Sequence, residues 1–405
     1  MAVPKIRFPG FTDAWEQRKL GDVLEITTRL NNDNEYDKQD VLSVSDEYGL
    51  INQIKFQGRS FAANDVSGYK KVQPDDIVYT RSPLALKPYG IIKKSFSEAG
   101  IISPLYIVNT VKEGNDSTFL YYNFDSPEKT NNYLKPLVRM GAKHTMNISN
   151  DEWLSGEIWI TSEEEQKKIG KFFRLFDNAL TLHQRKLESM KLLKKSLLQK
   201  MFPKSGETVP EVRFPGFTDA WEQRKVSELL EERNEQAPES SDYPLMAFIA
   251  NIGVAPKGER YDRGALVKDA ENKLYKRTEI GDFIYSSNNL ETGSIGLNNY
   301  GNACISPVYS IFKPTGIADS DFIGRRFIRK DFINSMVKWR QGVVYGQWKI
   351  HESDFMKIQV AVPSLEEQRK IGEFLSSLDN LITLHQRKVE ILHKLKKSLL
   401  QQMFV

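Results

Sequence analysis

Two long stretches of the chain place apolar residues alternately four and three positions apart, the heptad pattern of helices that pack along a seam. From Ser162 to Met201 the first stretch contains no proline and one glycine, Gly170. Ser162 and Ser364 each precede acidic residues, which suit the positive end of a helix dipole. The pattern predicts a central helix over 162–204 and a C-terminal helix over 364–405. The seam positions are Ile169, Phe173, Phe176, Leu180, Leu187, Met190, Leu197 and Met201, then Ile371, Leu375, Leu378, Ile382, Val389, Leu392, Leu399 and Met403.

Two polar positions interrupt both seams. His183 and His385 occupy the first, and Lys194 and Lys396 occupy the second. Such a residue either lies near a solvated edge, where it is tolerated, or fixes the register by penalising slipped pairings. Two helices of about 38 residues would each extend roughly 57 Å at 1.5 Å per residue. If they pack antiparallel, His183 would lie near His385.

The regions outside these helices alternate short apolar runs with turn residues, which is typical of strands. Stretches 116–136 and 319–339 have the spacing of helices. We therefore predict two mixed α/β domains, over 1–161 and 205–363, with the strand order left open. The expected strands are 76–80, 101–108 and 158–160 in the first domain, and 283–286, 308–312 and 358–362 in the second.

The chain also repeats itself, which bears on the whole fold. Regions 22–158 and 226–360 share only faint landmarks, such as Asp76-Ile77-Val78-Tyr79 against Asp282-Phe283-Ile284-Tyr285. Their flanks, in contrast, are nearly identical. An exchangeable middle on a constant framework explains this better than a duplication with neutral drift, which would have changed the flanks too. The matching flanks are 3–19 with 209–225 (15 of 17 positions), 181–186 with 383–388, and 194–202 with 396–404 (eight of nine).

Composition excludes several classes of protein. The 405 residues include one cysteine, Cys304, and five histidines, and the formal net charge is +4. A disulfide framework and a cysteine-rich metal site are therefore excluded, and no His-Glu-x-x-His-like spacing occurs. There is no run of about 18 apolar residues and no apolar signal-peptide core. We expect a cytoplasmic protein with no membrane partner and no metal site.

Motifs of catalysis are missing from the sequence. There is no phosphate-binding loop, no glycine-rich nucleotide fingerprint after a strand, and no Asn-Pro-Pro-aromatic tetrapeptide. Asp75 could open a nuclease-like pair of carboxylates, but acid-x-Lys partners such as Glu165-Gln166-Lys167 lie 90 residues away on the long helix. Asp75 therefore fits a turn better, and Cys304 fits a core position. We expect a chain without catalysis of its own.

Bulk charge does not mark a DNA interface. Region 22–158 has a net charge of −4 and region 226–360 of −1, so DNA recognition would need local patches. Lys, Arg, Asn, Gln and Ser can bind phosphate or read base edges, and aromatic rings can pack against sugars and bases. Each patch could equally be solvated surface. The candidates in loop-like segments are Tyr69, Lys70, Lys71, Arg81, Ser82, Lys143, His144, Thr145, Lys276, Arg277, Ser287, Asn288, Asn289, Tyr345, Gln347, Trp348 and Lys349.

Three features together resemble one family: the repeated RFPGFTDAWEQRK arm, the strand that leads into a Glu-rich helix start, and the LTLHQRK…LKKSLLQKMF helix. They are similar to the specificity subunit of type I restriction–modification systems, over the whole chain. The resemblance implies an α+β protein with a pseudo-twofold repeat. Two target-recognition domains, preceded by arms 3–21 and 209–225, would be separated by antiparallel coiled-coil helices near 163–202 and 365–404. Each domain would read half of a bipartite DNA site, with half-sites roughly one turn, about 10 bp, apart.

The resemblance also implies partners that carry the chemistry. Two methyltransferase subunits would dock on the conserved regions and methylate adenine with S-adenosylmethionine. Two motor–nuclease subunits could add translocation and cleavage that depend on ATP and Mg. No cofactor is expected on this chain. The residues expected in helix packing or partner docking are Phe173, Phe176, Leu180, His183, Arg185, Leu375, Leu378, Ile382, His385 and Arg387, with Asp177, Gln184, Lys186, Asp379, Gln386 and Lys388 beside them.

Other functions stay open at this point. A methylation-only assembly would show the same pattern, because the motor–nuclease lies on another chain. A self-sufficient nuclease or methyltransferase would act as the purified chain. A coiled-coil scaffold with protein-binding arms would bind specific and scrambled duplexes alike.

Overall fold

The computed structural model describes residues 2–140, 146–204, 206–257, 273–343 and 347–405. The chain forms two compact units. Unit 1 comprises Met1–Arg185 with Gln386–Val405, and unit 2 comprises Lys186–His385. Each long helix is therefore shared between the units: its start belongs to the unit of the domain that precedes it, and its end belongs to the other unit.

Among the described residues, the helices and strands of the two halves follow a common order, except that α2 occurs only in the first half and β15 only in the second. The first half has β1 (Glu16–Lys19), α1 (Leu20–Val23), β2 (Leu24–Ile26), β3 (Leu42–Ser45), β4 (Gly49–Asn52), α2 (Gln53–Gln57), β5 (Lys70–Val72), β6 (Ile77–Thr80), β7 (Ile91–Lys94), β8 (Gly100–Ile102), β9 (Ile107–Val111), α3 (Ser117–Asn123), α4 (Pro127–Leu134), β10 (Arg139–Met140), β11 (Met146–Asn147), α5 (Asn150–Ser155), β12 (Glu157–Ile160) and α6 (Glu163–Lys200). The second half has β13 (Glu222–Lys225), α7 (Val226–Leu229), β14 (Leu230–Glu232), β15 (Gln236–Ala237), β16 (Ala247–Ile249), β17 (Gly253–Ala255), β18 (Tyr275–Thr278), β19 (Phe283–Tyr285), β20 (Ile295–Leu297), β21 (Ala303–Ile305), β22 (Ser310–Pro314), α8 (Ser320–Phe327), α9 (Lys330–Val337), β23 (Gln341–Val343), β24 (Gln347–Lys349), α10 (Glu352–Phe355), β25 (Gln359–Val362) and α11 (Leu365–Met403).

A four-stranded antiparallel sheet in the order β2-β9-β6-β7 lies at the centre of the unit 1 domain. The pairs β3-β4, β5-β8 and β10-β11 form smaller two-stranded sheets. One apolar cluster joins the central sheet to α3, α5 and α6, and it includes Tyr79, Phe119, Trp153 and Phe173. Trp15 of the arm belongs to the same cluster. The arm, the domain and the start of α6 therefore share one core.

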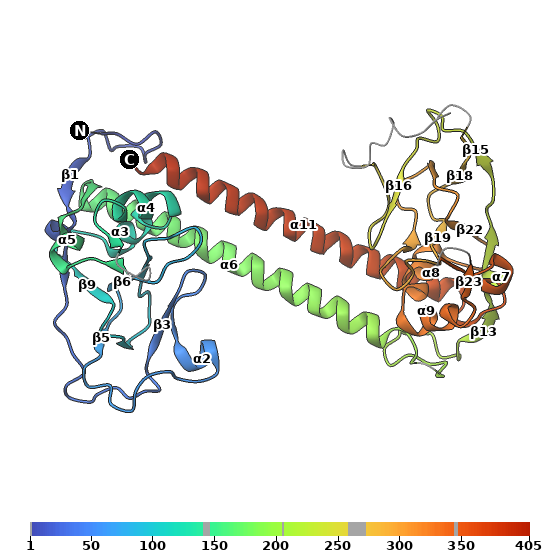
Figure 1. Cartoon of the computed structure of the whole chain (residues 1–405), viewed down its shortest axis with the longest axis horizontal. Helices are drawn as coiled ribbons and strands as arrows, with labels where there is room; N and C mark the ends of the chain where they lie inside the picture. Colours follow the sequence, from blue (N-terminus) through green and yellow to red (C-terminus); the bar gives the residue numbers. More distant parts are fainter. Residues whose placement is uncertain (1, 141–145, 205, 258–272, 344–346) are drawn as a thin grey trace. The chain divides into compact units, whose positions relative to one another are not determined.

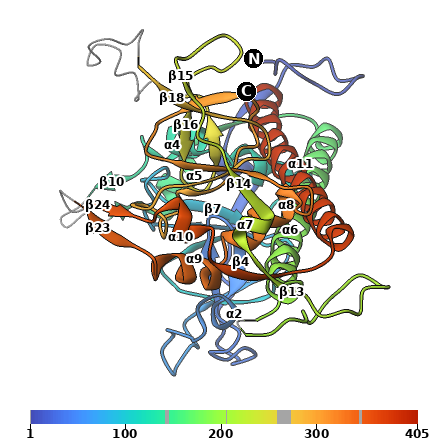
Figure 2. The same cartoon turned by 90° about the vertical axis from the view of Figure 1, so that its right-hand side faces the viewer.

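The unit 2 domain repeats this architecture with different side chains. Its central sheet has the order β14-β22-β19-β20, and β16-β17 and β23-β24 correspond to β3-β4 and β10-β11. Strand β15 extends the third small sheet to the order β15-β18-β21, and β15 and β18 lie side by side in both views (Figures 1 and 2). The core again joins the sheet, the arm tryptophan Trp221 and the long helix residue Leu375.

Each arm contacts the end of the other long helix. The Ile6 amide donates to the Gln402 carbonyl, and the Val212 amide donates to the Lys200 carbonyl, both at 3.0 Å. Strand β1 pairs with β12, and β13 pairs with β25 in the matching register. Each arm therefore contacts the end of the long helix from the other repeat: the first arm contacts the end of α11, and the second arm contacts the end of α6.

The predicted long helices are confirmed, and all the seam residues are buried or half-buried. Within unit 1, Asp177 of α6 contacts Lys396 of α11, and Gln184 of α6 contacts His393 of α11. Residue numbers increase along one helix as they decrease along the other, so the helices run antiparallel. Both lysines that interrupt the seams form ion pairs: Lys396 with Asp177, and Lys194 with Asp379 in unit 2.

Three local predictions need comment. The single strand expected over 101–108 is wrong, because a turn in which the Tyr106 amide donates to the Ser103 carbonyl (3.1 Å) separates β8 from β9. The turn interpretation of Asp75 is confirmed: its φ of +72° lies in the left-handed region just before β6. His183 and His385 are both half-buried but belong to different units, so their proximity stays a prediction.

Candidate nucleic-acid interface

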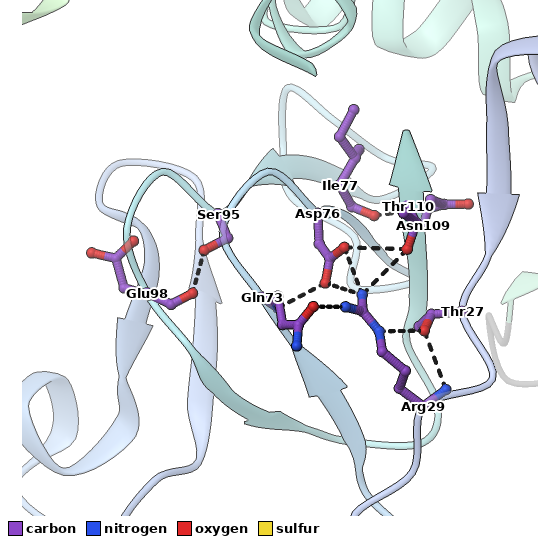
Figure 3. Close-up of polar contacts among 9 residues, drawn as sticks. All are labelled: Thr27, Arg29, Gln73, Asp76, Ile77, Ser95, Glu98, Asn109 and Thr110. Carbon is purple, nitrogen blue, oxygen red and sulfur yellow. Dashed lines mark hydrogen bonds and ion pairs between the residues drawn. The ribbon is translucent and has the colours of Figure 1, made fainter. Parts of the chain in front are cut away.

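An ion pair with a buried aspartate holds the central strand of each domain. Arg29 reaches the carboxylate of Asp76, with Nη2 2.7 Å from Oδ1, and its Nε donates to the Thr27 hydroxyl at 2.8 Å (Figure 3). Asp76 also accepts from the Gln73 amide at 2.7 Å, which closes the turn before β6. Burial raises the pKa of Asp76 more than Arg29 and the hydrogen bonds lower it.

Unit 2 contains the equivalent ion pair, but its arginine lies at a different distance after the first strand of the central sheet. Arg233 lies 2.9 Å from Asp282, which accepts from the Glu279 amide at 2.7 Å. Sequence reasoning found the two aspartates only as landmarks and missed the arginines, which follow β2 and β14 at different distances from the strand ends. The aspartate that precedes each central strand was the available signal. The pairs fix the strands whose far ends carry the candidate contacts.

In unit 1, the end of β6 meets the hairpin β10-β11. Arg81 follows β6 and donates through Nη2 to the Ile148 carbonyl at 2.8 Å, just beyond β11. Arg139 on β10 extends a largely exposed guanidinium that pairs with Glu152 at 2.7 Å. Ser82 is exposed next to Arg81. The segment after the central strand and the hairpin therefore form one surface, which we call the unit 1 hairpin face (80–82, 139–140 and 146–148).

Unit 2 has a corresponding surface with other chemistry. The Ser287 hydroxyl accepts from the Ile350 amide at 3.0 Å, and the Asn288 side-chain oxygen accepts from the Trp348 amide at 2.6 Å. Ser287 is buried, whereas Asn288 and Asn289 are exposed. The Trp348 ring is 47% exposed, with the Arg340 guanidinium 5.8 Å from its centroid. We call segments 286–289, 341–343 and 347–350 the unit 2 hairpin face.

The loop-like setting expected for Lys70, Lys71, Lys276 and Arg277 is wrong, because the first two lie on β5 and the other two on β18. Their side chains are largely engaged within the protein. Lys70 donates to the Tyr106 carbonyl at 2.6 Å, and its pKa is lowered by burial and by the nearby Arg81. Lys71 pairs with two acids, Asp33 at 2.6 Å and Glu35 at 2.7 Å.

In unit 2, burial lowers the pKa of Lys276, which lies within the field of Lys349 and Glu352. Arg277 pairs with Glu235 at 2.6 Å and lies over the Tyr243 ring.

Contact of any of these residues with DNA stays a prediction. The candidates Lys143, His144, Thr145 and Tyr345 lie outside the described residues. Gln347 and Lys349 belong to the unit 2 hairpin face, and Tyr69 packs against the apolar cluster of Val41, Val66 and Ile101.

The two faces differ in what they can recognise. Arg81 spends one N–H group on Ile148, and a guanidinium has five such donors, so it can still bind phosphate or guanine. Asn288 keeps its side-chain NH₂ group, which suits an acceptor on a base edge. An exposed tryptophan can pack against a sugar or base. The arrangement suits two different DNA contacts on one scaffold.

The helix residues predicted for packing or docking differ in burial, and the docking role stays a prediction. Phe173, Leu180, Leu375 and Leu378 are buried within the chain. The half-buried residues are Phe176, His183, Ile382 and His385, and the exposed ones include Arg185 and Arg387. The nuclease-like acid Glu165 is buried on α6 and accepts a bidentate pair of bonds from Arg7 at 2.8 and 2.7 Å, which is a structural role.

Among the described residues, no cluster of three or more His, Cys, Asp or Glu side chains could hold a metal ion. Over the same residues, no helix has the length and apolar character needed to span a membrane.

Comparisons with known proteins agree with this architecture. Residues 12–192 and 218–394 each match the family model of the type I restriction modification DNA specificity domain. Two specificity subunits of Methanocaldococcus jannaschii are similar. The one provisionally named type I restriction enzyme MjaX is 22% identical, over 95% of this chain and 92% of its own. The type I restriction enzyme MjaVIII subunit is 26% identical, over 70% and 68%.

One solved structure shares the fold over the whole chain. The type I restriction–modification S subunit from M. genitalium aligns with a TM-score of 0.57 at 13% identity, covering 100% of this chain and 99% of that one.

Proposed function

Because the chain belongs to the type I restriction modification DNA specificity family, we propose that each unit reads one half of a bipartite duplex DNA site through its hairpin face. One observation carries this proposal: domains with the same strand order present different side chains at the same place. Arg81 lies on the unit 1 face, and Asn288 and Trp348 lie on the unit 2 face. A shared scaffold with different reading groups suits an asymmetric site.

The long helices would then set the spacer and bind the partners. Two pairs of equivalent leucines point away from the seams: Leu182 and Leu384 are 66% and 63% exposed, and Leu193 and Leu395 are 50% and 46% exposed. Exposed apolar groups repeated on two helices support protein contacts, and their repetition suits two copies of one partner. We assign the outer helix surface of each unit (Leu182 and Leu395 in unit 1, Leu384 and Leu193 in unit 2) to one methyltransferase subunit each.

In this proposal the chain itself is not catalytic and works in the cytoplasm. The methyltransferase partners would hold S-adenosylmethionine and methylate adenine. Two motor–nuclease subunits would supply ATP- and Mg-dependent translocation and cleavage where the host has them. A methylation-only assembly is the second candidate, because recognition and methylation need nothing from the motor–nuclease.

The first experiment is the host methylome at single-base resolution, with and without this gene. We expect one bipartite adenine-methylated motif to disappear. If no motif is lost but a methyltransferase co-purifies with the chain, the partner is silent and the recognition role still stands for test by binding. If no motif is lost and no methyltransferase co-purifies, the proposal is wrong.

The half-site assignment has its own test. Arg81→Ala should weaken binding to the parent duplex by about 5- to 100-fold, the range of one lost base contact, and relax the sequence preference in one half only. Trp348→Ala should act on the other half. An exposed control on the same domain, Leu105→Ala, should leave binding unchanged. Equal binding of scrambled duplex by the parent chain would instead support a protein scaffold.

The partner surface can be tested separately from DNA reading. The double variant Leu182→Asp, Leu384→Asp should no longer co-purify with the methyltransferase. It should still bind duplex DNA, because both leucines lie on the long helices and neither belongs to a hairpin face. Leu105→Asp, equally exposed on the unit 1 domain, is the matched control. Retained co-purification of the double variant would remove the outer helix surface from the proposal.

A further inference from the structure

The two recognition domains differ in most side chains, yet each presents the same short motif to the constant parts of the chain. In unit 1 the motif opens α3 as Asp116-Ser117-Thr118-Phe119, and in unit 2 it opens α8 as Asp319-Ser320-Asp321-Phe322. A third position follows six residues after the aspartate, Tyr122 in unit 1 and Arg325 in unit 2. The surrounding positions change freely: Tyr121 in one domain is Gly324 in the other.

The aspartate caps its helix and docks it on the long helix. Asp116 accepts from the Phe119 amide at 2.7 Å, and its own amide donates to the Gln166 side chain on α6 at 3.0 Å. The close approach depends on Gly170, because an added Cβ would lie 2.5 Å from the Asp116 Oδ1 atom and 3.0 Å from the Phe119 amide nitrogen.

Unit 2 reproduces each of these contacts. Asp319 accepts from the Phe322 amide at 2.9 Å, and its amide donates to the Gln368 side chain on α11 at 3.0 Å. A Cβ added to Gly372 would lie 2.8 Å from Asp319 Oδ1. Gln368 and Gly372 are the second-repeat equivalents of Gln166 and Gly170, at the common offset of 202 residues.

The phenylalanine of the motif inserts between the two repeated flanks. The Phe119 ring lies 5.5 Å from Trp15 at 63° and 5.2 Å from Phe404 at 29°. In unit 2, the Phe322 ring lies 5.5 Å from Trp221 at 64° and 5.6 Å from Phe202 at 27°. One residue of each variable domain thus contacts the arm of its own repeat and the helix end of the other.

The third position binds a constant aspartate with whatever donor the domain carries. The Tyr122 hydroxyl donates to Asp177 at 2.7 Å, and the Arg325 guanidinium lies 2.9 Å from Asp379. A lysine from the opposite helix end completes each site: Lys396 lies 2.8 Å from Asp177, and Lys194 pairs with Asp379. A neutral and a charged donor are therefore both accepted here.

We propose that this motif, Asp-Ser-x-Phe with a hydrogen-bond donor six residues after the aspartate, is the attachment code by which the constant framework accepts a recognition domain. The receiving site consists of a Gln, Gly and Asp spaced four and seven residues apart on a long helix, an arm tryptophan and a helix-end phenylalanine. Its occupant is any recognition domain that carries the motif. The near identity of the flanks follows, because both copies must close around the same side chains.

The test is a chimera that carries the second domain in both positions. Residues 226–358 replace 20–156, since the Leu20 amide bonds to the Gly156 carbonyl (2.7 Å) and the Val226 amide to the Ile358 carbonyl (2.9 Å) at equivalent borders. We expect cooperative unfolding and a protease-resistant first domain, with a Tm within about 5 °C of the parent. The result would stand whether or not the DNA role holds, because neither readout uses DNA.

A matched chimera separates attachment from folding of the domain itself. Phe322→Ser and Asp319→Leu are introduced in the first copy only, while the second copy reports on the intact domain. We expect the doubly substituted first copy to be cleaved at least about tenfold faster. Asp319→Ser alone, with Phe322 kept, retains a capping side chain and should leave the first copy resistant. If the unaltered first copy is cleaved as fast as the doubly substituted one, or if breaking the motif changes nothing, the attachment code is wrong.

The glycines give an independent test, because the expected change in Tm is opposite in sign to the usual effect of Gly→Ala in a helix. Alanine in place of an unhindered helical glycine normally stabilises a helix. Because the docked helix occupies the space at Gly170 and Gly372, Gly170→Ala and Gly372→Ala should each lower the Tm of their unit by about 3–8 °C. A rise in Tm for either variant would contradict the close approach on which the receiving site depends.

Discussion

The ion pairs of Lys396 allow the coupling between a helix end and a recognition domain to be measured. Lys396 lies on α11, 2.6 Å from Asp125 of the unit 1 domain and 2.8 Å from Asp177 of α6. Its side chain is only 16% exposed and that of Asp125 11%. Lys396→Met keeps the length of the aliphatic stem but leaves two largely buried carboxylates without their shared cation.

The cost can be worked out from these contacts. Removing one partner of a buried pair costs about 3–5 kcal/mol. Lys93 remains 4.0 Å from Asp125, and the Tyr121 and Tyr122 hydroxyls still donate to the two carboxylates. We therefore expect a loss of about 2–3 kcal/mol, because part of the charge stays compensated. For a unit of about 200 residues, this lowers Tm by roughly 4–12 °C.

The assay is calorimetric and urea unfolding of the parent and the variant, with Lys194→Met as the matched control. Lys194 is 31% exposed, and its partner Asp379 also keeps Arg325 at 2.9 Å. The control should therefore cost less than about 1 kcal/mol, as partly exposed pairs do. Equal losses for the two variants, or no loss for Lys396→Met, would refute the reasoning.

The pH dependence has a definite sign. Burial alone would raise the pKa of Asp125, but Lys396 and Lys93 lower it overall, below the ordinary value of 3.8. A carboxyl whose folded pKa is lowered contributes stability above its unfolded pKa and loses it as the pH falls through the folded one. The difference between parent and Lys396→Met should thus be full above about pH 3.8 and shrink in more acid solution.

Further outcomes follow from other contacts. Arg7→Met should destabilise unit 1 by about 2–4 kcal/mol, since it leaves the fully buried Glu165 unpaired; urea unfolding measures it. Burial alone would raise the pKa of Glu165, but Arg7 and Thr161 lower it overall, so this difference too should fade in acid, and a difference that grew would contradict it. Asn109→Ala should cost about 1–3 kcal/mol, because Asn109 accepts from buried Trp153 at 2.9 Å; unchanged near-UV dichroism and Tm would argue against that role.

Local pattern was enough to predict much of this fold. The heptad spacing located both long helices, because burial on one face of a helix imposes its own period on the chain. The near-identical flanks indicated a constant framework, and the divergent middles indicated separate recognition domains. The charge and motif search also predicted a chain without catalysis. These properties are written in short segments or in repeated ones.

Strand order and the make-up of each unit needed the tertiary structure. Nothing in a single segment indicates that β9 lies between β2 and β6, or that residues 101–108 turn back into two strands, because strand pairing depends on distant partners. Arg29 and Arg233 follow β2 and β14 at different distances, yet they reach the equivalent carboxylates Asp76 and Asp282. Only the folded chain brings them there.

The candidate site divides in the same way. Residue type alone suggested Arg81, Asn288 and Trp348, and it suggested Lys71 equally, since a sequence shows a charge but not its neighbours. The structure places Lys71 against two carboxylates and gathers the other three on the hairpin faces. The sequence by itself thus determined the helices, the repeats and the class of chain. Tertiary contacts between residues far apart decided which polar groups are bonded within the protein and which remain exposed on the hairpin faces.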